Sequence, residues 1–175
     1  MKTMRFFLGL FALILAVGAC STKTVMPPEP WPFQERAVVF RLEADEQLNL
    51  YHGTSHTLLL CIYQLRDPNA FNQAMEDQKG LYKLLSCKRF DPSVLSFKKL
   101  VLQPGESREV VMDRAEGAHY VGVAAGYYNL QKEKVCRLFS IPLVEEKKGF
   151  KRILKPGVLE VGLYLGKEGI EEKGK

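Results

Sequence analysis

The chain has 175 residues, a formal net charge of +5 and four cysteines. This length suits a single domain, and a charged fraction of 26% excludes wholesale disorder. Lys2 and Arg5 supply two of the positive charges, so +3 remains beyond residue 19, without a long basic run that would favour nucleic acid.

The first predicted element is a secretory signal peptide over residues 1–19. After a short basic start, Phe6–Val17 is almost purely apolar, too short to span about 30 Å of hydrocarbon but typical of a signal peptide. Val17–Cys20 then resembles the lipobox of bacterial lipoproteins, although an ordinary signal peptide that contains a cysteine is the alternative. The resemblance implies acylation of Cys20, and Ser21 after it favours the outer membrane over the inner one.

Residues 20–35 are expected to form the lipidated cysteine and a proline-rich tether. Prolines stand at positions 27, 28, 30 and 32, and proline-rich chain is extended, with a rise of about 3.1 Å per residue. A folded domain is predicted at 36–166 and a flexible tail at 167–175.

The domain shows mainly β patterns. Apolar residues alternate with others at Val38–Glu43, which predicts a half-buried strand, whereas Thr57–Leu65 is apolar on both faces and predicts a central strand. Further strands are expected at 94–102, 109–112, 119–128, 135–143 and 158–165, with 48–51 continuing or following the first strand. Pro104 and Gly105 predict a type II turn between two of these strands.

One helix is expected to start at Asp67–Pro68 and to run as a loose apolar stripe to Leu85, with Gly80 weakening its middle. Lys147–Lys155 is interpreted as a basic, solvated loop. We therefore predict a mainly all-β fold, a two-layer β-sandwich with a short helical insertion after the second strong strand.

Catalytic and metal-binding signatures are absent from the sequence. His52 and His56 have a spacing that can ligate a metal on a helix, but Gly53 between them indicates a loop, so we predict no metal site, no cofactor and no enzymatic activity. Tyr127 and Tyr128 lie near a strand end, where they can form a contact surface or pack in the core.

The cysteines beyond the lipobox are odd in number. Two among Cys61, Cys87 and Cys136 can pair in an oxidising periplasm, and no pairing is favoured over the others.

An ordered series of motifs resembles the TssJ-type outer-membrane lipoproteins of bacterial type VI secretion systems. The series comprises the lipobox, Leu48–Asn49 before a short loop, Ile62–Leu65, Asp67 with Phe71, Leu102–Glu106, Tyr120–Ala125 and Arg137. The family's usual tryptophan before that arginine is Cys136 here, which indicates a divergent member.

The resemblance implies a sandwich of transthyretin-like form, on the inner leaflet of the outer membrane and facing the periplasm. It also implies assembly of a trans-envelope complex through the periplasmic C-terminal region of the inner-membrane TssM protein. The family's contact loop corresponds to Asn49–Thr57, which makes the candidate partner-binding residues Asn49, Leu50, Tyr51, His52, Gly53, Thr54, Ser55 and His56. The alternatives are a periplasmic lipoprotein that binds lipid or a small molecule, and a secretin pilot.

Overall fold

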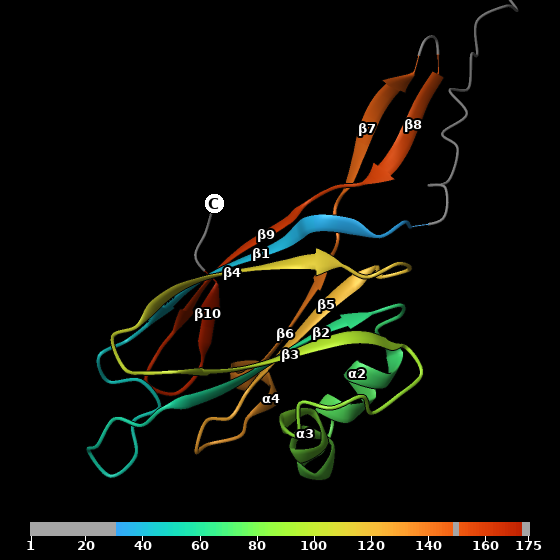
Figure 1. Cartoon of the computed structure of the whole chain (residues 1–175). Helices are drawn as coiled ribbons and strands as arrows, with labels where there is room; N and C mark the ends of the chain where they lie inside the picture. The colour runs from blue at the N-terminus through green and yellow to red at the C-terminus, as the bar shows by residue number, and fades with distance from the viewer. Residues whose placement is uncertain (1–30, 149–150, 173–175) are drawn as a thin grey trace, which may run out of the picture.

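Two four-stranded sheets enclose one hydrophobic core in the computed structural model, which describes residues 31–148 and 151–172 (Figure 1). The first sheet, in the order β10-β9-β1-β4, contains β1 (Gln34–Ala44), β4 (Ser107–Arg114), β9 (Leu159–Leu165) and β10 (Ile170–Glu172). The second, in the order β3-β2-β5-β6, contains β2 (Leu58–Leu65), β3 (Val94–Leu102), β5 (Tyr120–Ala125) and β6 (Cys136–Ser140). The predicted mainly β class is confirmed. β1 and β9 run parallel, whereas the other strand pairs of these two sheets in the described residues are antiparallel.

β2 is buried on both faces because a helical layer covers the side that faces away from the first sheet (Figure 1). Phe71 and Leu84 from this layer are fully buried. The Tyr63 hydroxyl, on β2, donates a hydrogen bond to the Leu84 carbonyl. The apolar run at 57–65 therefore reflects burial on two sides, as the sequence predicts.

The single helix predicted after β2 is two helices, α2 (Asn69–Met75) and α3 (Gln78–Leu85). The chain turns at Asp77, whose carboxylate accepts a hydrogen bond from the Gly80 backbone at 2.6 Å and caps α3. A Cβ at Gly80 would lie 2.1 Å from the Ala74 carbonyl oxygen. Gly80 thus permits the close contact of the two helices rather than weakening one helix. A further short helix, α4 (Lys132–Val135), precedes β6.

The basic segment interpreted as a solvated loop is instead a β-hairpin of β7 (Leu143–Lys148) and β8 (Lys151–Pro156). It projects away from the sandwich (Figure 1). Arg152 pairs with Glu145 at 3.2 Å and Lys155 with Glu146 at 3.0 Å. Because charged side chains occupy both faces, the segment lacks the apolar alternation by which a strand is recognised.

The two ends of the domain extend beyond the predicted bounds. β1 begins at Gln34, and Trp31 before it packs on His119 with ring centroids 4.2 Å apart. At the other end, Ile170 of the expected tail is buried and β10 pairs with β9. The predicted signal peptide and Cys20 lie outside the described residues.

Cys61 on β2 forms a disulfide with Cys87 just after α3, and buried Cys136 is free. This resolves the pairing that the sequence leaves open. Burial raises the pKa of the Cys136 thiol to about 12, so this group stays protonated and unreactive near neutral pH.

Candidate functional site

The predicted contact loop, which joins β1 to β2, has a two-residue hairpin turn at its tip. Tyr51 and Thr54 exchange backbone hydrogen bonds of 2.9 and 3.0 Å. The two residues between them, His52 (φ 48°) and Gly53 (φ 76°), both have positive φ, as a type I′ turn requires. Gly53 adopts this conformation without a Cβ penalty, so the loop tip has a defined geometry.

Asn49 lies at the base of the loop and is 4% exposed. Its side-chain amide donates to the Thr57 carbonyl at 3.1 Å, and its carbonyl oxygen accepts from the Tyr128 backbone at 3.0 Å. Asn49 therefore ties both ends of the loop to the chain that follows β5. Its role in the fold is positional, because a buried side chain offers no surface to a partner.

Four aromatic rings gather on the outside of this loop. Tyr51 and Tyr128 stack with ring centroids 4.2 Å apart and an interplanar angle of 10°. Tyr51 is 45% exposed and Tyr128 is 55% exposed. His52 lies 4.1 Å from the Tyr51 ring and His56 lies 4.8 Å from the Tyr128 ring. We call these four residues, Tyr51, His52, His56 and Tyr128, the aromatic cluster.

Of the two adjacent tyrosines, Tyr127 packs in the core and Tyr128 lies on the surface. The sequence leaves both placements open for each residue. Tyr127 is buried and donates a hydrogen bond to the Gly169 carbonyl at 2.9 Å, and burial raises its pKa. Tyr128 joins the aromatic cluster. The position of the two tyrosines at a strand end indicated a possible contact surface. Which tyrosine faces outward depends on β10, a strand that the sequence analysis did not predict.

A surface hollow of about 500 Å³ lies beside the aromatic cluster. Its lining includes Tyr82 on α3 and Val101 on β3, which are 59% and 45% exposed. Neither residue was identified from the sequence as part of a site, because the helix and the strand that carry them were predicted from their buried residues. Together with the cluster they form one partly apolar, concave surface, the kind of surface that recognises another protein.

The remaining predicted loop residues hold the loop in place. The Leu50 backbone donates to the Lys167 carbonyl at 2.9 Å, and the Ser55 hydroxyl donates to the Glu46 carbonyl at 3.0 Å. Thr54 completes the turn. The loop is thus connected to neighbouring chain at several points and presents its rings from a rigid base.

Two further features of the described residues bear on the site. Within residues 31–148 and 151–172, no group of three or more histidines, cysteines and acids is placed to hold a metal ion. In the same part of the chain, no helix is both long and apolar enough to cross a membrane. His52 and His56 contribute rings to the aromatic cluster.

The sequence model of the type VI secretion lipoproteins (VasD, EvfM, TssJ) matches residues 36–155. No match was found among curated proteins.

Solved structures share the fold. The T6SS lipoprotein TssJ1 from Pseudomonas aeruginosa matches with a TM-score of 0.58 and 23% identity, covering 85% of this chain and 99% of that one. Serratia marcescens Lip, a membrane-bound component of the type VI secretion system, matches with a TM-score of 0.61 and 23% identity, covering 79% and 97%. A chain of the structure of the T6SS protein TssM C-terminal domain (869–1107) from EAEC matches with a TM-score of 0.59 and 20% identity, covering 79% and 98%. Since the family match spans more than half of the chain, this protein belongs to the type VI secretion lipoproteins.

Proposed function

We propose that this lipoprotein anchors the trans-envelope complex of a type VI secretion system at the outer membrane. It does so by binding the periplasmic C-terminal region of a TssM-type inner-membrane protein. The role is structural and needs no catalysis or cofactor, and the sandwich is of the transthyretin-like form that the family resemblance implies. The fold match within the structure of a TssM C-terminal domain supports this choice of partner.

The observation that carries the proposal is the aromatic cluster. Exposed, stacked rings on a rigid turn offer large contact area with little loss of conformational entropy on binding. The adjoining hollow, lined in part by Tyr82 and Val101, provides a concavity for an apolar side chain of the partner. Among the predicted loop residues, Tyr51, His52 and His56 make the contact, whereas Asn49 holds them in position.

Replacing Tyr51 and His52 by alanine tests the contact. We expect Tyr51→Ala with His52→Ala to reduce co-purification of the TssM periplasmic fragment strongly, because alanine truncation of central aromatic contacts costs about 2 kcal/mol or more. The thermal midpoint should stay near that of the parent, because Tyr51 and His52 are exposed.

Phe33→Ala is the matched control, since Phe33 is an exposed aromatic (56%) just before β1 and far from the loop. It should leave co-purification intact. Parent protein that fails to bind the cognate fragment would overturn the proposal, and equal losses of binding and folding would assign the pair to structure.

The anchor is tested at Cys20. Cys20→Ser should abolish the acyl mass on the N-terminal peptide and leave the domain folded, because the buried core side chains of the described residues lie between positions 37 and 170. Parent protein whose N-terminal peptide carries no acyl mass, or that fractionates with the inner membrane, would contradict the outer-membrane assignment.

A further inference from the structure

The tip of the β7–β8 hairpin places like charges opposite each other. In the register, Lys147 lies opposite Arg152. Like charges directly opposite on neighbouring strands destabilise a hairpin. The acids Glu145 and Glu146 lie nearer the base, where they pair with Arg152 and Lys155. The sequence from 147 to 152 contains four cationic residues and no acid. An external anion would relieve the repulsion between Lys147 and Arg152.

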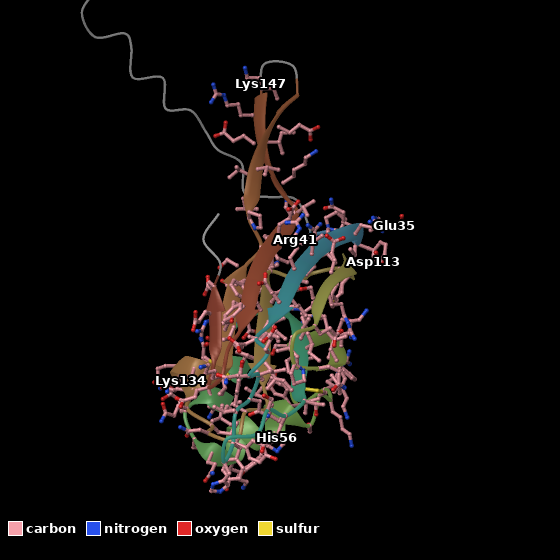
Figure 2. All side chains as sticks on the ribbon, turned by 90° about the vertical axis from the view of Figure 1, so that its left-hand side faces the viewer. Glu35, Arg41, His56, Asp113, Lys134 and Lys147 are labelled. Carbon is pink, nitrogen blue, oxygen red and sulfur yellow. A yellow bond between two sulfur atoms is a disulfide. The ribbon has the colours of Figure 1, made fainter. Side chains whose placement is uncertain are left out.

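The base of the hairpin is joined to the point where the chain arrives from Cys20. The buried Arg114 guanidinium donates to the Gly157 carbonyl at 3.3 Å, just after β8, and to the Pro32 carbonyl at 2.9 Å. It also lies over the Trp31 ring, 5.7 Å from the centroid. One side chain therefore fixes the hairpin and the N-terminal end of the domain together. Figure 2 shows Lys147 at this end and His56 at the opposite end of the molecule.

The lengths of hairpin and tether are compatible. β7 has 6 residues, which span about 20 Å at about 3.3 Å per residue. The chain from Cys20 to Trp31 contains three prolines and can reach roughly 30 Å at about 3.1 Å per residue. With Cys20 in the membrane, the hairpin tip can therefore reach the lipid surface.

We propose that Lys147 and Arg152, on either side of the hairpin tip, bind the anionic phospholipid headgroups of the membrane that holds the anchor. The inference rests on the proposed anchor at Cys20, which sets the end of the molecule that faces the membrane. Contact at two points, acyl chains and hairpin tip, orients the sandwich with the aromatic cluster directed away from the lipid. Each cation near an anionic surface raises binding about fivefold, and salt screens the effect.

Vesicle co-sedimentation tests this with the chain from residue 20 onward carrying Cys20→Ser, so that no acyl chain contributes. We expect binding to phosphatidylcholine vesicles that contain phosphatidylglycerol, and none to pure phosphatidylcholine. Lys147→Gln with Arg152→Gln should weaken binding about 25-fold. The control, Lys79→Gln with Lys88→Gln, removes two exposed lysines of the helical region and should change binding less than about threefold, since these positions lie far from the tip.

Equal losses in the two double variants, equal binding to both vesicle types, or no binding to anionic vesicles would overturn the proposal. A hairpin variant that binds vesicles like the parent but no longer binds the TssM fragment would also overturn the proposal, since the hairpin would then contact a protein and not lipid. The hairpin variant should unfold near the parent's temperature, because it relieves the repulsion between Lys147 and Arg152 but also loses the exposed Arg152–Glu145 ion pair.

The outcome is separable from that of the anchor. Salt at 1 M, where the Debye length is about 3 Å, should release the unacylated chain from vesicles but not the acylated chain from membranes. A chain that lacks acyl mass on Cys20 yet binds anionic vesicles through the hairpin would refute the anchor and leave the lipid contact standing.

Discussion

The two ends of the sandwich present opposite kinds of surface. At one end, Asn49 and several backbone hydrogen bonds hold a turn in which aromatic rings stack on one another. At the other end, a two-stranded hairpin projects from the body (Figure 1). Charged side chains lie on both of its faces. The difference matches the two contacts that we propose: shape-specific protein recognition needs rigid apolar groups, whereas a charged lipid surface needs only cations within reach.

Reducing the Cys61–Cys87 disulfide should have the largest effect on stability and should act at the loop end. The bond closes a separation of 26 residues, and a loop of that size predicts a loss of about 3 to 4 kcal/mol in the free energy of unfolding. Urea unfolding with and without reductant measures the loss. A Cys61→Ala, Cys87→Ala variant should show no dependence on reductant. Lipid binding by the hairpin tip should be the same in both states, and a change there would break the separation of the two ends.

Asn49→Ala should cost about 2 kcal/mol, because it removes two hydrogen bonds of a buried amide. Unlike the Tyr51 and His52 changes, it should lower both stability and TssM binding, since the ring positions depend on it. Asn129→Ala, at an exposed asparagine in the adjoining loop, should change stability by less than about 0.5 kcal/mol. An Asn49→Ala protein as stable as the parent would show that the loop conformation does not depend on the hydrogen bonds of Asn49.

A small pH effect is expected at the hairpin end. Burial, with a contribution from Arg66, lowers the pKa of His119 below 6.5. The unfolded chain then takes up the proton first as the pH falls below 6.5, so the folded state loses stability between that value and the lower folded pKa. His119→Gln should remove this part of the pH dependence. Fluorescence of Trp31, the single tryptophan and the ring partner of His119, follows unfolding, and identical slopes in parent and variant would exclude the effect.

Local signals in the sequence predicted much of the sandwich correctly. The alternation at Val38–Glu43 lies within β1, and the turn at Pro104–Gly105 has the expected hydrogen bond from Glu106 to Gln103 and a positive φ at Gly105. These elements are recognisable because their own side chains define them, through a two-residue period or the φ preference of proline and glycine.

The missed elements depend on partners distant in sequence. β10 contributes one buried side chain, Ile170, to the core. A single apolar residue gives no hydrophobic periodicity from which a strand can be predicted. The β7–β8 hairpin has a charged pattern that resembles a solvated loop. The disulfide pairing follows from the position of α3 over β2, where Cys87 comes within 5.3 Å of Cys61 between Cα atoms.

The candidate site was predictable as a segment but not as a surface. The family resemblance located the loop at Asn49–Thr57, whereas the roles of its residues differ according to burial. Tyr128, Tyr82 and Val101 join the surface from other elements, and no local sequence signal connects them to the loop.

The most direct test compares the two ends in one calorimetric titration series with the TssM periplasmic fragment. We expect Tyr51→Ala with His52→Ala to raise the dissociation constant about 30-fold or more, which corresponds to about 2 kcal/mol. Lys147→Gln with Arg152→Gln should leave it within about threefold of the parent, since rim or remote charges contribute little to affinity. A dissociation constant that rises for the hairpin variant and stays unchanged for the loop variant would contradict the account.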